Sequence, residues 1–95
     1  MIKKQYLKSR PVCKVTFYVP GDAGSQVELA GDFNNWAPQP MKQLKDGRFS
    51  ATLELEPGRE YQFRYRLDGS HWRNEEEADR QVPNEFGEEN SVLAL

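Results

Sequence analysis

The chain has 95 residues, enough for one domain built around one hydrophobic core. Its formal net charge is −2 at pH 7. This balance argues against nucleic acid as the main partner, because a face that binds phosphates usually makes a domain basic. The lysine-rich residues 1–14 and the acidic residues 75–89 are interpreted as solvated ends of the chain.

Cysteine usage and hydropathy indicate the compartment. Cys13 is the only cysteine, so no internal disulfide can form, which fits a reducing environment. No apolar run is long enough for a signal peptide or a membrane span. We therefore expect a cytoplasmic location and no membrane partner.

The first predicted strand starts after an aperiodic segment. Residues 1–11 have no clear period and end at Pro11, so we expect a flexible N-terminal tail followed by a single domain over residues 12–95. Apolar and polar residues then alternate from Cys13 to Val19, which predicts a half-buried strand. A second alternating strand covers Gln26 to Ala30.

Turn signals divide the remaining chain. Asp46-Gly47 and Pro57-Gly58 predict hairpins on either side of a strand, and a further strand covers Glu60–Leu67 up to the turn at 68–70. Residues 74–89 are expected to be mostly loop, with at most a turn of helix near 75–78, before a last strand over 90–95. About seven short strands at intervals near ten residues predict an all-β fold, an antiparallel sandwich.

Trp36 is the most informative single residue. It ends a polar loop that follows the second strand, where a large aromatic either packs down or remains available for a ligand. A flat apolar face among amide groups suits a sugar ring, whose C–H face can lie on the indole while its hydroxyls bond to polar neighbours. Both outcomes remain open for Trp36 at this point.

A second group of candidates lies on the strand Glu60–Leu67. If its aromatic residues are buried, Arg64 and Arg66 point to the opposite face, and the turn at 68–70 brings Trp72 beside them. A guanidinium can stack on an indole and donate to hydroxyls. The alternative is that both arginines are ordinary solvated residues and that Trp72 belongs to the core; for Arg66 we favour the solvated interpretation.

These segments together resemble a known family. The runs 27–36, 46–49, 55–58 and 61–69 are similar in order and spacing to the family 48 carbohydrate-binding modules. That family includes the glycogen-binding domain of the AMP-activated protein kinase β subunit and the N-terminal early-set domains of isoamylases and branching enzymes. The resemblance covers residues 13–95 and implies an immunoglobulin-like β-sandwich of the early-set type.

The resemblance also implies a set of carbohydrate-binding residues. The positions that match the family's glucan site are Trp36, Arg64, Trp72, Phe86 and Asn90. Arg64 stands where the family often has lysine, Phe86 where it has leucine, and Glu88 where it often has threonine. Both aromatics, the cation and the amide are therefore kept, while Glu88 changes the charge and the expected specificity.

The resulting functional prediction is non-catalytic binding of α-glucan, which could be glycogen, starch or a maltooligosaccharide. The alternative is an early-set interaction module that docks on a glycan-metabolising enzyme or kinase without binding glucan itself. We expect no enzyme activity, because no nucleophile–base pair is evident and the acidic loop at Glu75–Glu77 offers no buried carboxyl pair. His71 has no Cys/His cluster around it, so we expect no metal and no cofactor.

Overall fold

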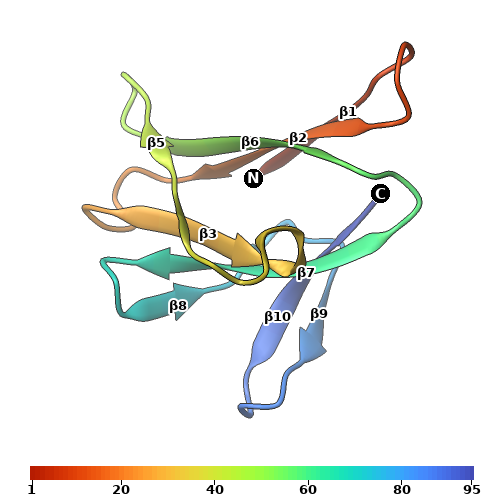
Figure 1. Ribbon diagram of the computed structural model, residues 1–95. Helices are drawn as coiled ribbons and strands as arrows, with labels where there is room; N and C mark the ends of the chain where they lie inside the picture. Colours follow the sequence, from red (N-terminus) through yellow and green to blue (C-terminus); the bar gives the residue numbers. More distant parts are fainter.

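Two antiparallel sheets face each other in the computed structural model, which describes residues 1–95 (Figure 1). The four-stranded sheet has the order β1-β2-β6-β5, from β1 (Ile2–Tyr6), β2 (Cys13–Val19), β6 (Phe49–Leu55) and β5 (Lys42–Gln43). The six-stranded sheet has the order β4-β3-β7-β10-β9, with β8 paired to β7. Its strands are β4 (Gln39–Pro40), β3 (Val27–Gly31), β7 (Glu60–Leu67), β10 (Glu89–Ala94), β9 (Arg80–Pro83) and β8 (His71–Arg73). The predicted all-β antiparallel sandwich is confirmed.

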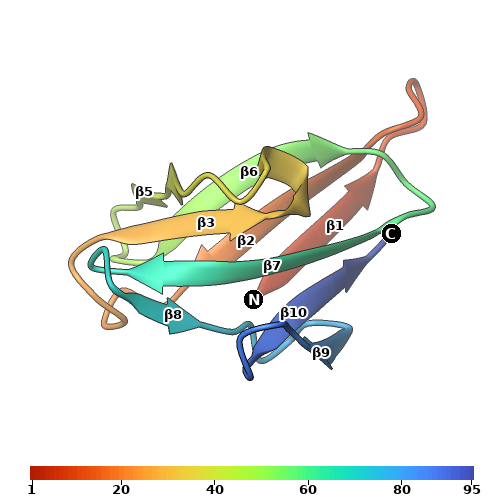
Figure 2. The same ribbon diagram turned by 60° about the horizontal axis from the view of Figure 1, so that its bottom comes forward.

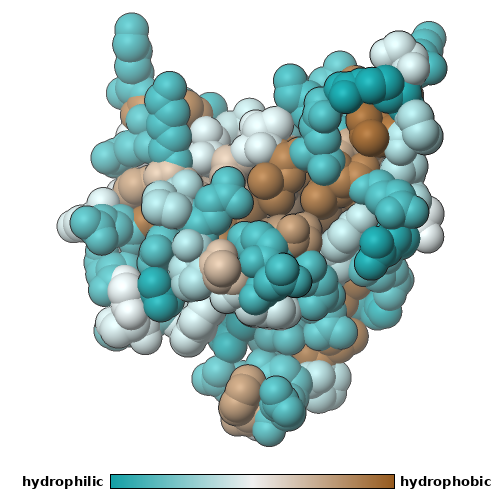
Figure 3. Space-filling view, in the orientation of Figure 1, coloured by the Kyte–Doolittle hydropathy of each residue, from teal (hydrophilic) through white to brown (hydrophobic).

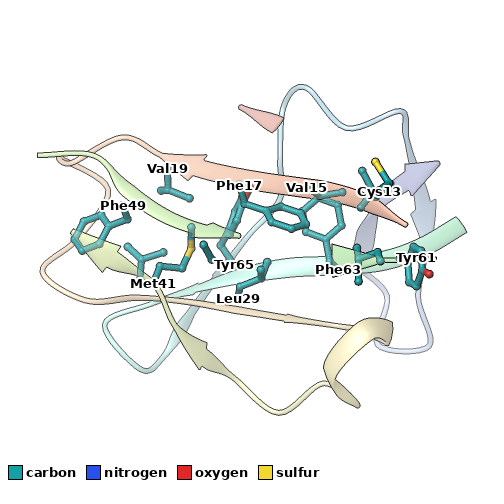
Figure 4. Close-up of a cluster of buried hydrophobic side chains, with 14 residues drawn as sticks. Cys13, Val15, Phe17, Val19, Leu29, Met41, Phe49, Tyr61, Phe63 and Tyr65 are labelled. Carbon is teal, nitrogen blue, oxygen red and sulfur yellow. The ribbon is translucent and has the colours of Figure 1, made fainter. Parts of the chain in front are cut away.

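The core forms between the layers because the strands alternate as the sequence indicates. Along β2 every second residue from Cys13 to Val19 is buried, and along β7 the buried residues are Tyr61, Phe63 and Tyr65. The rings of Phe17 and Phe63 meet across the two sheets at 5.2 Å in an edge-to-face arrangement (Figure 4). On the face that Figure 3 shows, most side chains are hydrophilic, while apolar ones are visible between the two layers.

The expected N-terminal tail is wrong. Residues 2–6 form β1, which pairs with β2 from Ile2 opposite Phe17 to Tyr6 opposite Cys13. β1 is an edge strand, and none of its side chains is fully buried. A strand that contributes so little to the core does not need a clean apolar period, so its sequence carries no strand signal.

The expected long loop at 74–89 is also only partly right. It contains β9, which pairs with β10, and the segment near 75–78 makes a turn rather than a turn of helix. Pro83 ends β9 at the edge of the sheet, where a missing N–H costs no ladder hydrogen bond. With β1, β4 and β9, which the sequence did not predict, the count rises from about seven strands to ten.

One edge of β7 carries two different strands in succession. β10 pairs with residues 60–63 of β7, and β8 pairs with residues 65–67 (Figure 2). Arg64 therefore lies at the junction between the two partner strands. Because Tyr61, Phe63 and Tyr65 face the core, Gln62, Arg64 and Arg66 project from the outer face of the six-stranded sheet. This junction positions the candidate site.

Candidate functional site

A cleft of about 860 Å³ lies on the outer face of the six-stranded sheet, between the loop after β3 and the β9–β10 hairpin. All five residues that the resemblance implies line it: Trp36, Arg64, Trp72, Phe86 and Asn90. They come from four separate parts of the chain, and the pairing of β3, β8 and β10 along β7 brings them together. Asp32, Gln62, Asn84 and Glu85 also line the cleft, and no motif in the sequence pointed to them.

The loop that carries Trp36 starts from an unusually close backbone approach. A Cβ on Gly31 would lie 2.6 Å from the Gln62 carbonyl oxygen and 2.7 Å from the Phe63 Cβ, so only glycine fits. The 3-10 turn η1 (Asp32–Asn34) follows, and Asn35 and Trp36 then both adopt left-handed backbone angles, with φ of 55° and 59°. A left-handed tryptophan costs roughly 1–2 kcal/mol, a strain that is typical of functional sites.

Hydrogen bonds hold Trp36 in that conformation. Its backbone N–H donates to the Gly31 carbonyl at 2.9 Å, and its indole N–H donates to Asp32 Oδ1 at 3.0 Å. Asp32 Oδ2 in turn accepts the backbone N–H of Gln62 at 2.7 Å. The half-buried indole is thus tied to the sheet by its polar edge, which leaves its ring to line the cleft.

Two guanidinium groups lie close to the indole of Trp72. The guanidinium carbons of Arg64 and Arg66 each lie 5.9 Å from the ring centre, within the range of a cation–π contact. Arg66 is also the cross-strand partner of Trp72. The indole is 41% exposed, so Trp72 is not a core residue.

Each of these arginines is already paired with a carboxylate. Arg64, with a side chain only 11% exposed, lies 2.8 Å from Glu88 and donates from Nε to the Asn74 Oδ1 at 2.7 Å. Arg66 lies 2.8 Å from Glu28 on β3. Arg66 therefore has a defined position, paired with Glu28 and close to the Trp72 ring, instead of the freely solvated one favoured from its sequence.

Asn84 organises the opposite wall of the cleft. Its Oδ1 accepts the backbone N–H groups of Phe86 and Glu88 at 2.9 and 3.1 Å, which shapes the β9–β10 hairpin. Its Nδ2 donates to Asn90 Oδ1 at 3.1 Å, and Asn90 Nδ2 donates to Gln62 Oε1 at 3.0 Å. Phe86 stands at the rim, 80% exposed. An exposed phenylalanine beside a polar cleft is a contact that an apolar ligand face could use.

The acidic segment after β8 differs from its expected solvated state. The side chain of Glu75 is buried, only 5% exposed, and accepts hydrogen bonds from the Met1 amino group, the Tyr65 hydroxyl and the Glu77 backbone N–H. Burial opposes ionisation, but these hydrogen bonds outweigh it and hold the pKa of Glu75 below its ordinary value. For Tyr65, burial and the neighbouring Glu75 carboxylate both disfavour the ionised form, so they raise the pKa of its hydroxyl. Glu75 is absent from the cleft lining, so it supports the fold there and not the candidate site.

The structure contains no cluster of three metal-ligating side chains among histidine, cysteine, aspartate and glutamate. No helix has the length and apolar content needed to span a membrane. Cys13 is buried in the core, as its place in the β2 alternation indicates. The chemistry available in the cleft is therefore that of indole and phenyl faces, amides, guanidinium groups and carboxylates.

Two comparisons with known proteins bear on this cleft. The family described as the glycogen recognition site of AMP-activated protein kinase matches residues 14–95. The chain is also 33% identical over 75 residues to Protein PTST homolog 2, chloroplastic, from Arabidopsis thaliana; that match covers 78% of this chain and 13% of the relative. The chain thus spans a small part of the length of that relative. The match over nearly the whole sandwich, including every residue that lines the cleft, shows that the chain belongs to the family of AMP-activated protein kinase glycogen-recognition domains, a carbohydrate-binding module.

Proposed function

We propose that the cleft binds α-1,4-glucan, as glycogen, starch or a maltooligosaccharide, and does so without catalysis. The observation that carries the proposal is the convergence of Trp36, Trp72, Arg64 and Asn90 on one cleft of about 860 Å³. Two indoles can receive the C–H faces of successive glucose rings, and the guanidinium and amide groups can bond to hydroxyls between them. Phe86 extends the apolar contact at the rim.

Short glucan chains should bind weakly to the cleft, because its polar side chains already have partners within the protein. Arg64 is paired with Glu88, and Asn90 with Asn84 and Gln62, so sugar hydroxyls must compete with existing contacts. Water and protein partners are exchanged for sugar hydroxyls at little net gain. On a polymer, many glucose units are presented at once, and the apparent affinity rises through multivalency.

The contacts that Arg64 and Asn90 make within the protein also support the alternative function, that of a docking module. A cleft whose polar groups are already satisfied could belong to a module that docks on a glycan-metabolising enzyme or kinase and no longer binds glucan. The match to a much longer relative is compatible with a module of this kind. The two functions differ in whether the isolated chain binds sugar.

The deciding experiment is a titration of the 95-residue chain with maltoheptaose and β-cyclodextrin, followed by tryptophan fluorescence and NMR amide shifts. We expect saturable changes at Trp36, Trp72 and the β9–β10 hairpin. Trp36→Ala and Trp72→Ala should each weaken binding by about tenfold or more, since a stacked aromatic pair contributes on the order of 1 kcal/mol beyond its buried area.

Cellohexaose serves as the matched ligand control, because it presents the same sugar in β-linked, flat form. Glucan binding would be rejected if millimolar maltoheptaose caused no saturable shift. It would also be rejected if both tryptophan variants bound maltoheptaose as tightly as the wild-type chain. Capture of a starch-metabolising enzyme that does not depend on added glucan would then support the docking function.

A further inference from the structure

All six lysines of the chain lie on the four-stranded sheet and its connecting loops. They are Lys3, Lys4, Lys8, Lys14, Lys42 and Lys45. Residues 1–19 and 42–55, which form this sheet, hold eight Lys and Arg residues against two acids. The remaining residues hold five against thirteen. An acidic chain therefore has one strongly basic layer.

Most of these lysines have no counter-ion within the molecule. Lys4 alone among them pairs with a carboxylate, that of Asp79 at 3.0 Å. The two acids of the segments are already taken by arginines: Asp46 by Arg48 at 3.0 Å and Glu54 by Arg10 at 2.7 Å. The other five lysines form no ion pair, although Glu54 on β6 is the cross-strand neighbour of Lys14.

The outer face of this sheet is hollowed where two of the lysines stand. Lys3 and Lys14 flank a groove of about 300 Å³, whose floor carries the hydroxyl groups of Thr16, Ser50 and Thr52. Lys3 is the cross-strand neighbour of Thr16, and Thr16 that of Thr52, so ammonium and hydroxyl donors form one row across the sheet. Such a row of donors is suited to bind carboxylate groups.

We propose that this groove docks an extended acidic segment of a partner protein. A strand presents alternate side chains to one face, so acidic residues at every second position could meet Lys3 and Lys14 together. β1 also lies at the edge of its sheet, where an extended backbone can add as a further strand. Lysines on an edge strand usually discourage pairing with another strand, but they attract a strand that carries acidic residues.

An acidic polypeptide fits the groove better than other polyanions. The groove is lined by two lysines and no arginine, fewer cations than a surface that follows a phosphate backbone usually presents. The groove also lacks a free aromatic platform for bases, since the Arg48 guanidinium lies 4.5 Å above the Tyr18 ring. A short segment needs only the local positive field.

Docking there would leave the candidate sugar cleft open. The groove is on the outward side of β1, β2 and β6, whereas the cleft is on the outward side of β7 and its neighbours in the other layer (Figure 1). The hydrophobic core separates the two. A partner and a glucan could therefore be held at the same time, on opposite faces of the sandwich.

The test uses a synthetic peptide of alternating Glu and Ser residues, and a peptide with Gln in place of Glu as its neutral control. In NMR titrations of the 95-residue chain, we expect amide shifts at Lys3, Lys14, Thr16 and Thr52 and none around Trp72. K3Q/K14Q should weaken binding about tenfold, K3R/K14R should keep it, and K8Q/K45Q should change it by less than about threefold. Added salt should weaken binding of the Glu peptide.

Several outcomes would overturn the inference. These are equal binding of the neutral peptide, shifts that map to another surface, and tighter attachment to single-stranded DNA or to phosphatidylserine vesicles than to the Glu peptide. Self-association that is lost in K3Q/K14Q would assign the groove to a second copy of the chain instead. W36A/W72A should leave peptide binding unchanged, so a failure of sugar binding and a failure of this inference are distinguishable.

Discussion

The indole N–H of Trp36 donates a 3.0 Å hydrogen bond to the carboxylate of Asp32. The other oxygen of that carboxylate accepts the backbone N–H of Gln62 on β7. Asp32 thus connects the tryptophan loop to the strand that carries Arg64. Trp36, with its left-handed backbone, depends on this connection to hold its ring against the cleft.

Asp32→Ala should weaken sugar binding without unfolding the chain. Loss of the carboxylate frees the indole of Trp36, and the ordering of a mobile side chain then costs binding energy of about 0.5–1.5 kcal/mol, or roughly three- to tenfold in affinity. Isothermal titration with β-cyclodextrin measures the change. Asp32→Asn keeps one acceptor oxygen for the two N–H donors of Trp36 and Gln62, so it should lose less affinity than Asp32→Ala. Wild-type affinity in Asp32→Ala would contradict an orienting role.

Glu88→Ala should strengthen sugar binding. The Glu88 side chain is 59% exposed and pairs with the Arg64 guanidinium. In the wild-type chain, sugar hydroxyls must displace this carboxylate before they can bind to Arg64. An exposed ion pair is worth roughly 0–1 kcal/mol, so the gain should be about threefold. Higher ionic strength should raise the affinity of the wild-type chain but not that of the variant.

Glu85→Ala is the matched control for Glu88→Ala, since Glu85 lines the same cleft and makes no ion pair. Its affinity should be unchanged. Weaker binding by Glu88→Ala would mean that this carboxylate itself accepts sugar hydroxyls.

Phe86→Ala should separate binding from stability. The side chain is 80% exposed, so its removal should change the free energy of unfolding by less than about 0.5 kcal/mol in urea titrations. Binding to glycogen in affinity gel electrophoresis should fall, whereas Phe86→Leu should keep most of the apolar contact. Unchanged glycogen retardation by Phe86→Ala would remove this residue from the site.

Glu75 should make the fold sensitive to acid. Its folded pKa lies below the ordinary value of 4.5, so its ionised form stabilises the chain above that pH. This stabilisation is lost as the pH falls below 4.5 through the folded pKa. Glu75→Gln should cost about 1–3 kcal/mol at pH 7 and flatten the decline in acid, measured by thermal unfolding from pH 7 to pH 3.

Glu76→Gln is the control for that measurement, because Glu76 is exposed and makes no hydrogen bond through its side chain. It should follow the wild-type curve throughout. A Glu75→Gln variant with the wild-type acid limb would show that other carboxylates govern acid unfolding.

The sequence by itself determined the sandwich and the inward face of its main strands. Period-two alternation in residues 13–19 and 60–67 and the turns at 46–47, 57–58 and 68–70 were sufficient, because burial on one face and turn geometry are local properties. The resemblance also selected five residues that line one cleft. It gave no signal for Asp32 or Asn84. Their hydrogen bonds to the site residues span only two to six positions, but these bonds form only in the particular loop and hairpin conformations that the structure shows.

Only the tertiary structure decided which isolated polar residues act together. Edge strands such as β1 and β9 bury little and so carry no period, and Glu75 is buried although its segment is acidic. The positions of Arg64 and Arg66 around Trp72 depend on β8 and β10 sharing one edge of β7. Pairing between strands distant in sequence sets such contacts, and the free energy of that pairing is a property of the whole sandwich rather than of any segment.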